Sequence, residues 1–218
     1  MSFSLRRIVS VLSLAAVLTG GAFWALSQGD DAQADDKISA PRAHDIVIGD
    51  PKAPVTVVEY SSLSCPHCAD FFVRVLPEFQ KKYIDTGKVK LISRDYPLNE
   101  PALRAAMLVH CAPKDKQIPF LRVLFSSQDK WAFDKNFTAA LSSIAALGGI
   151  PQDKFDACMQ NTPLQTDIIK VRQEAETVLK VESTPTFFIQ EQKLTGPHEL
   201  SNLSQAIDPL LAKGPVKH

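Results

Sequence analysis

The sequence predicts an α/β fold in which a sheet is interrupted by a helical insertion. Strand-like runs occur at residues 55–60 and 88–94 and again at 186–189. Between them, over residues 99–180, the hydrophobic periodicity is helical and no strand pattern occurs. With 218 residues, the chain is long enough for one large domain or two small ones. The two halves of the sheet are therefore expected to meet in space beside a block of helices.

Composition and charge exclude several classes of protein. Hydrophobic residues make up 45% of the chain and charged residues 22%, which excludes disordered, collagen-like and multi-span membrane proteins. The 24 Lys and Arg residues balance 24 Asp and Glu residues. A neutral chain has no electrostatic reason to bind nucleic acid or an anionic membrane surface, and we expect neither partner.

Residues 1–34 form a candidate export segment. Arg6 and Arg7 precede an uncharged run, residues 8–29, that is rich in Val, Leu and Ala. This is the pattern of a signal whose positive end stays in the cytoplasm. Residues 32–34 fit a small-x-small cleavage site, whereas the apolar run is nearly long enough to span a bilayer. A cleaved signal peptide and an N-terminal membrane anchor both stay open, and either one places the rest of the chain in an oxidising compartment.

The first half of the predicted sheet follows a short polar linker at residues 35–44. The run at 55–60 (VTVVEY) is rich in β-branched residues and follows Pro54, which indicates a buried strand. The next helix has an apolar face formed by Phe72, Leu76, Phe79 and Tyr83. Pro77 should kink this helix. Because the strand at 88–94 comes next, the order strand, helix, strand favours a parallel pair.

Five helices are predicted in the insertion. Asn99 can cap the first of them, and Gly148 with Gly149 stops the third. The predicted helices span residues 99–111, 119–126, 137–147, 151–159 and 163–179. Beyond the insertion, a hairpin partner at 193–195 follows the returning strand, and a last helix spans residues 199–211.

The motif Cys65-Pro66-His67-Cys68 lies at the start of the helix that follows the first strand. Pro66 fits the first helical position, where its missing N–H costs nothing. Cys65 then occupies the N-cap, and its sulfur can accept hydrogen bonds from the N–H groups of His67 and Cys68. Those donors, the helix macrodipole and a protonated His67 should lower the pKa of Cys65 from the free value of about 8.5. Cys68 is expected to be the more buried and less acidic thiol.

An acidic thiol at Cys65 indicates disulfide exchange. A thiolate of low pKa is a good leaving group, and its stability makes the disulfide form a stronger oxidant. Two other interpretations of the motif stay open. It could be half of a zinc site, although Cys111 and Cys158 do not form the second C-x-x-C of a zinc ribbon. It could also be a purely structural disulfide.

With VEYSSLSCPHC after a strand and STPTFF after the helical block, the chain resembles the DsbA family of exported thiol:disulfide oxidoreductases. The resemblance implies a thioredoxin-like fold with an inserted all-helical domain. Residues 45–98 and 181–213 would form the thioredoxin-like domain, and residues 99–180 would form the insertion.

The same resemblance implies a role for each residue of the motif. Cys65 matches the nucleophilic cysteine that bonds to substrate, Cys68 its partner in the redox-active disulfide, and His67 the thiolate stabiliser. Pro185 matches the family's cis-proline, and the backbone of Thr184 and Pro185 would pair with a substrate peptide beside the dithiol. An X-Pro bond is where a cis peptide costs least.

Three further residues are candidates through the resemblance. Glu59 matches an acid that the family keeps beneath the active site to assist proton movement, although by pattern alone it is equally a solvated strand end. Cys111 and Cys158 lie in the helical block, as in a branch of the family with a second disulfide there. Paired, they would stabilise the fold by up to about 4 kcal/mol. The alternative is two buried thiols that act as small hydrophobic residues.

The resemblance implies an enzyme of oxidative protein folding in the periplasm or another extracytoplasmic space. Its substrates would be reduced or unfolded polypeptides, and a membrane quinone-linked oxidase of the DsbB type would reoxidise it. The sequence has no metal, nucleotide or flavin motif, and a monomer is expected because the short segment before the first strand leaves no room for a dimerisation module.

Two positions differ from the family pattern. Thr184 stands where the best-known DsbA has valine, and residues 190–193 (QEQK) replace the usual Asn-Gly turn. Because of Thr184, a thiol reductase or disulfide isomerase of the same fold stays open. From other classes, a non-enzymatic metal carrier that uses Cys65 and Cys68 and a peptide-binding assembly factor also stay open.

Overall fold

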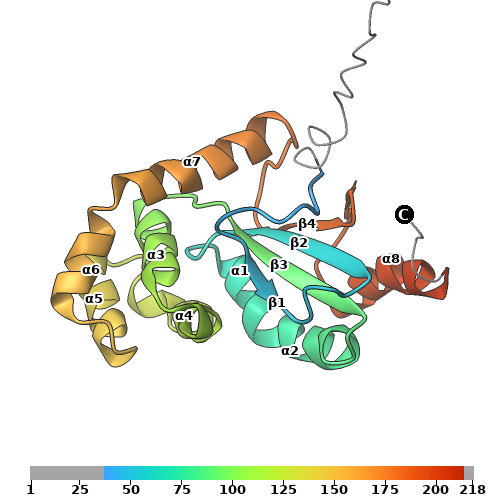
Figure 1. The fold of residues 1–218 in the computed structure, drawn as a ribbon, viewed down its shortest axis with the longest axis horizontal. Helices are drawn as coiled ribbons and strands as arrows, with labels where there is room; N and C mark the ends of the chain where they lie inside the picture. The colour runs from blue at the N-terminus through green and yellow to red at the C-terminus, as the bar shows by residue number, and fades with distance from the viewer. Residues whose placement is uncertain (1–36, 214–218) are drawn as a thin grey trace, which may run out of the picture.

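A five-stranded sheet forms the centre of the protein, of which the computed structural model describes residues 37–213. Its strands are β1 (Ile46–Ile48), β2 (Val55–Ser61), β3 (Val89–Asp95), β4 (Thr186–Ile189) and β5 (Gln192–Lys193). The strand order is β1-β3-β2-β4-β5. β2 and β3 are parallel, as predicted, and the other neighbouring pairs are antiparallel. The return of β4 to pair with β2 confirms the predicted α/β fold with a helical insertion (Figure 1).

The predicted export segment at residues 1–34 lies outside the described residues. Between residues 37 and 213, no helix is both long enough and apolar enough to cross a membrane. The described part of the predicted linker, residues 37–44, is not a free linker. Ile38 is buried, and the side chain of Arg94 donates hydrogen bonds to the carbonyl oxygens of Ile38 (2.9 Å) and Ala40 (3.0 Å). That prediction is wrong over these residues, because a buried guanidinium on β3 holds the segment against the sheet.

The helix after β2 runs from Pro66 to Ile84 and contains two π-helical turns. Its segments are α1 (Pro66–Asp70), η1 (Phe71–Val75), α2 (Leu76–Phe79) and η2 (Gln80–Ile84). Pro77 has no N–H to donate, and the turn before it is widened, with the N–H of Leu76 bonded to the carbonyl of Phe71 five residues back. The predicted apolar face is buried, since Phe72, Leu76, Phe79 and Tyr83 are at most 2% exposed.

All helices between β3 and β4 belong to the insertion. They are α3 (Glu100–Cys111), α4 (Lys114–Ser126), the 3-10 turn η3 (Gln128–Lys130), α5 (Phe137–Leu147), α6 (Gln152–Met159) and α7 (Thr162–Thr177). As predicted, the Asn99 side chain caps α3 by accepting a hydrogen bond from the N–H of Ala102 at 3.0 Å. Residues 119–126 lie in a helix as predicted, and this helix, α4, begins earlier, at Lys114, with Pro119 in its second turn.

The insertion lies mostly to one side of the sheet. Figure 1 shows α3, α4, α5 and α6 gathered at one end, with α7 running from them back toward β4, and the C-terminal helix α8 (Leu200–Ala212) at the opposite end. The sheet has two buried faces. Val57 and Phe187 point into the larger core with α1 and α2, whereas Val58 and Phe188 point into a smaller core that includes Ala175 of α7.

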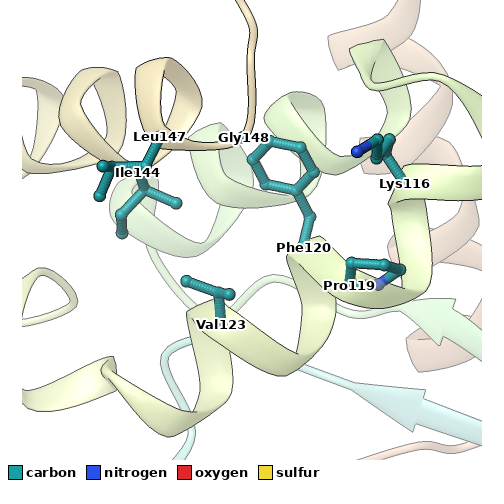
Figure 2. A pocket seen from close by; sticks show the side chains of 7 residues that line it. All are labelled: Lys116, Pro119, Phe120, Val123, Ile144, Leu147 and Gly148. Atoms are coloured by element: carbon teal, nitrogen blue, oxygen red, sulfur yellow. The ribbon is translucent and has the colours of Figure 1, made fainter.

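A pocket of about 250 Å³ opens between α4 and the end of α5 (Figure 2). Its wall is apolar except for Lys116, and the ring of Phe120 lies against Gly148. Gly148 ends α5, and Gly149 follows with a φ of +85°. The predicted stop at these two glycines is confirmed.

Candidate active site

Cys65 and Cys68 lie where β2 joins α1, at the carboxyl end of a buried strand. Cys65 is the N-cap residue of α1, and Pro66 is the first helical residue. Both cysteines are free thiols in this structure. Cys65 is 6% exposed and Cys68 is fully buried, whereas Pro66 and His67 are exposed. One edge of the dithiol is therefore open to solvent and the other faces the core.

The insertion helps to hold the loop that carries Cys65. The side-chain amide of Gln128, in η3, donates hydrogen bonds to the carbonyl oxygens of Leu63 (2.7 Å) and Cys65 (3.0 Å). Gln128 is itself buried, so these bonds are protected from water. The helical insertion thus has a direct structural role at the dithiol.

Thr184 and Pro185 lie beside the dithiol, at the start of β4. The peptide bond between them is cis. The sulfur of Cys65 donates a hydrogen bond to the carbonyl oxygen of Thr184 at 3.3 Å. The hydroxyl of Thr184 is also buried and has no hydrogen-bond partner among the described residues. The structure therefore brings together two candidate segments that the insertion separates in sequence.

The surroundings of Cys65 lower its pKa to about 5. The largest cause is hydrogen bonding with the Cys68 side chain, which outweighs the opposing effect of burial. The Thr184 side chain contributes next, followed by the backbone N–H groups of Cys68 and His67. The sulfur forms no capping hydrogen bond of ordinary geometry to either N–H, although both N–H groups lower its pKa in the expected direction.

The pKa of Cys68 moves in the opposite direction. Burial raises it, and the hydrogen bond to Cys65 and the charge of Glu59 add to this effect. The N–H of Ser62 donates to the sulfur of Cys68 at 3.5 Å. The structure thus gives the two thiols of the motif unequal acidities, with the acidic one at the more exposed position.

Glu59 is fully buried on β2, on the side of the sheet that faces α1. Neither of its carboxyl oxygens has a hydrogen-bond partner among the described residues, and the nearby Ser61 hydroxyl is likewise unpartnered. Burial raises the pKa of Glu59 to about 8, and the charge of Cys65 adds to this. The alternative of a solvated strand end does not apply, because the side chain carries its proton inside the protein at neutral pH.

His67 occupies the position expected from the motif, but its imidazole is not among the groups that lower the pKa of Cys65. Its backbone N–H group does lower that pKa. The thiolate-stabilising effect of the residue thus comes from its place in the first turn of α1.

His198 is a residue near the motif that the sequence analysis did not identify. It lies in the loop between β5 and α8, half-buried, with its ring centroid 5.2 Å from that of Phe187. Burial lowers its pKa, as does the charge of His67, whereas the charge of Cys65 raises it. A single histidine in a turn carries no sequence pattern that could have identified it.

Cys111 and Cys158 form a disulfide between α3 and α6, with a Cα–Cα distance of 6.0 Å. The bond closes a loop inside the helical insertion and involves neither thiol of the motif. Over residues 37–213, no cluster of three or more His, Cys, Asp and Glu side chains is arranged to hold a metal ion.

Comparison with known proteins connects this chain to a family. The Thioredoxin family model matches residues 42–209. The crystal structure of alpha-DsbA1 from Wolbachia pipientis is 35% identical, with a TM-score of 0.73 over 79% of this chain and 94% of that one. BdbD from Bacillus subtilis has the same fold, with a TM-score of 0.66 at 22% identity over 78% of this chain and 94% of that one.

The chain is also similar in sequence to curated proteins. A protein-disulfide oxidoreductase of Rickettsia prowazekii is 34% identical over 169 residues, which cover 77% of this chain and 62% of the relative. The chain therefore spans about three fifths of the length of the Rickettsia relatives that it matches.

Proposed function

Because the chain belongs to the DsbA family of thioredoxin-fold thiol:disulfide oxidoreductases, we propose that it transfers the Cys65–Cys68 disulfide to reduced polypeptides in an extracytoplasmic space. The observation that carries the proposal is the unequal acidity of the two thiols. The pKa of Cys65 is lowered to about 5, and that of Cys68 is raised. A stable thiolate at Cys65 favours the reduced protein, so its disulfide is a strong oxidant.

The reaction proceeds through a mixed disulfide on Cys65. A substrate thiolate attacks the sulfur of Cys65, the bond to Cys68 breaks, and its electron pair goes to the sulfur of Cys68. A second substrate thiolate then attacks the substrate sulfur of the mixed disulfide, and Cys65 leaves as a thiolate. The substrate loses two electrons, and the protein disulfide gains them and becomes the dithiol.

Glu59 supplies the proton that Cys68 needs when it becomes a leaving group. The carboxyl is buried, close enough to Cys68 for its charge to act on the thiol, and has a pKa of about 8. A carboxylic acid that keeps its proton at neutral pH can give it to a thiolate of higher pKa. It then regains a proton from solvent.

The backbone of Thr184 and Pro185 forms the surface on which a substrate peptide lies. Thr184 contacts the sulfur of Cys65 directly, so a chain that pairs with this segment is placed at the reacting atom. Recognition through backbone hydrogen bonds depends little on side chains and suits many substrates.

Turnover needs an external electron acceptor, for which we propose a membrane quinone-linked oxidase of the DsbB type. The segment at residues 1–34 would direct the chain out of the cytoplasm, as a signal peptide or an anchor. The protein would act as a monomer.

Redox equilibration with glutathione tests the proposal. The expected result is an equilibrium far more oxidising than that of thioredoxin, together with oxidation of a reduced, unfolded test protein. Cys65→Ser should abolish this activity, whereas the matched control Cys111→Ser/Cys158→Ser should retain it. A potential near that of thioredoxin would identify a reductase instead. Retained activity in the Cys65→Ser variant would exclude disulfide transfer by this motif.

A further inference from the structure

A buried amide of the helical insertion lies against the turn that carries Cys65. Residues 62–65 form this turn, in which the N–H of Cys65 donates to the carbonyl oxygen of Ser62 at 3.0 Å. The side-chain amide of Gln128 donates to the carbonyl oxygens of Leu63 (2.7 Å) and Cys65 (3.0 Å). Both partners are acceptors, so the group that faces them is the NH₂, with one N–H for each oxygen. Gln128 thus joins two peptide groups of the turn.

The rest of the described chain does not replace the bond to Leu63. The carbonyl oxygen of Cys65 also accepts from the N–H of Ala69 at 3.1 Å, in the first turn of α1. Over residues 37–213, the amide of Gln128 is the one hydrogen-bond donor to the carbonyl oxygen of Leu63. Leu63 and Gln128 are 4% and 7% exposed, so water has little access to the bond. Without the amide, a buried carbonyl group would lose its partner.

Gln128 is itself held in place relative to the dithiol. The N–H of Trp131 donates to the carbonyl oxygen of Gln128 at 3.3 Å, and the fully buried indole of Trp131 donates to the carbonyl oxygen of Leu124 at 2.9 Å. The ring of Phe125, at the end of α4, stacks on that of Phe72 in η1, with the centroids 4.8 Å apart. The amide is therefore fixed against the helix that begins at the dithiol, as a positioning group must be.

We propose that Gln128 is a positioning residue that holds Cys65 at the start of α1 and so makes the Cys65–Cys68 disulfide a stronger oxidant. The inference rests on the proposed function, because it concerns the same disulfide. The hydrogen bonds of Gln128 are to carbonyl oxygens and not to a sulfur. Gln128 thus acts on the chemistry through the backbone of Cys65.

The disulfide and dithiol forms depend on this contact to different extents. In the disulfide form, the bond to Cys68 fixes Cys65, since Cys68 lies inside α1 and is fully buried. In the dithiol form that bond is absent, and the first turn of α1 stabilises the Cys65 thiolate only while Cys65 stays at the N-cap. Loss of the amide of Gln128 should therefore destabilise the dithiol form more than the disulfide form. The disulfide would then be a weaker oxidant.

Redox equilibration with glutathione tests the proposal in Gln128→Met, which keeps the length of the side chain and removes both donors. The equilibrium should shift about tenfold toward the disulfide form, which corresponds to one pKa unit at Cys65. The pH dependence of alkylation by iodoacetamide should show the same rise in the pKa of Cys65. Gln117→Met is the matched control, because Gln117 is a buried glutamine of α4, 4% exposed, that has no hydrogen bond to residues 62–65. Both measurements should be unchanged in the control.

A milder variant covers the case in which Gln128→Met does not fold. Gln128→Asn keeps the amide but is one methylene group shorter, so it cannot reach both carbonyl oxygens and should shift the equilibrium in the same direction. If the Gln128 variants lower the free energy of unfolding but leave the equilibrium and the alkylation profile unchanged, the role of Gln128 is purely structural and the proposal is wrong. The proposed function would then still stand.

Failure of the proposed function gives a different result. The unmodified protein would then equilibrate with glutathione as thioredoxin does, or would fail to oxidise a reduced, unfolded test protein. The difference between the unmodified protein and Gln128→Met would still decide whether Gln128 positions Cys65, because that difference does not depend on the direction of the reaction.

Discussion

The sulfur of Cys65 donates a hydrogen bond to the carbonyl oxygen of Thr184 at 3.3 Å, although 119 residues separate them in sequence. This bond needs the thiol proton, so it is lost when Cys65 ionises. The hydroxyl of Thr184, buried and without a partner among the described residues, can then donate to the thiolate. Thr184 can therefore serve both protonation states of Cys65, as an acceptor through its carbonyl oxygen and as a donor through its hydroxyl.

The pKa of Cys65 should rise in both Cys68→Ala and Thr184→Val, and more in the first. The Cys68 side chain is the largest cause of the low pKa, and the Thr184 side chain is a smaller one. The pH dependence of alkylation of Cys65 by iodoacetamide measures the shift, because only the thiolate reacts. Thr186→Val is the matched control, since the Thr186 hydroxyl donates to Ser183 and not to the sulfur. An unchanged alkylation profile in Thr184→Val would contradict the assigned role of the hydroxyl.

Glu59→Gln should stabilise the protein at alkaline pH and change its stability little at acid pH. The pKa of Glu59 is about 8 in the folded protein, against an ordinary glutamate pKa of 4.5. Between these values the unfolded chain has lost a proton that the folded chain still holds, so the free energy of unfolding falls as the pH rises. Glutamine does not titrate, so the free energy of unfolding of the variant does not fall for this reason.

Urea unfolding of the disulfide form, in which neither thiol of the motif titrates, measures the effect of Glu59→Gln. The variant and the unmodified protein should have similar free energies of unfolding near pH 4.5 and diverge toward pH 8. Parallel curves over the whole range would show that the carboxyl ionises normally in the folded state.

Local sequence patterns predicted most of the elements that position the dithiol. The bounds of α5 and β4 agree with the prediction because glycines end the first and turn residues flank the second. The strand β1 was missed. Its three residues, Ile46–Ile48, are too few to show a period, and their conformation comes from pairing with β3.

The reactive cysteines could be inferred from the motif, but their surroundings could not. The contact between Cys65 and Thr184 spans the insertion, and the meeting of the two halves of the sheet implied it only weakly before the family resemblance was considered. The burial of Glu59 depends on what covers its side of β2, which its neighbours in sequence do not reveal. The position of His198 depends on its contact with Phe187, a tertiary interaction between a loop residue and a strand residue.

Arg94→Met should destabilise the protein by about 3–5 kcal/mol, because it leaves a buried carboxylate unpaired. The side chains of Arg94 and Asp45 are 2% and 3% exposed, and two hydrogen bonds of 2.7 and 2.6 Å join them. The same guanidinium also holds the carbonyl oxygens of Ile38 and Ala40. Urea unfolding of the disulfide form measures the change.

Two comparisons test whether the unpaired, buried carboxylate of Asp45 causes the loss of stability in Arg94→Met. Arg94→Met/Asp45→Leu leaves no unpaired carboxylate and should be more stable than Arg94→Met alone. Arg74→Met removes an ion pair with Asp70 whose side chains are 74% and 44% exposed, and it should change the stability far less than Arg94→Met does. If Arg94→Met lowered the free energy of unfolding no more than Arg74→Met, the hydrogen bonds of Arg94 to residues 38–45 would contribute nothing to stability.

Gly148→Ala and Gly149→Ala should both destabilise the insertion, for different reasons. A Cβ on Gly148 would overlap the ring of Phe120, which lies against Gly148 in the pocket wall (Figure 2). Such overpacking costs about 1–3 kcal/mol. At Gly149 no atom lies within 4 Å of the added Cβ, but the φ of +85° disfavours any side chain by about 1–2 kcal/mol.

A second substitution distinguishes the two causes. Phe120→Leu shortens the side chain that the new methyl group would meet, so the combined variant Phe120→Leu/Gly148→Ala should lose less stability than the sum of its two single changes. Phe120→Leu/Gly149→Ala should be additive, because backbone conformation and not contact sets the cost at Gly149. Additive costs in both pairs would show that the approach of Phe120 to Gly148 does not limit packing at the end of α5.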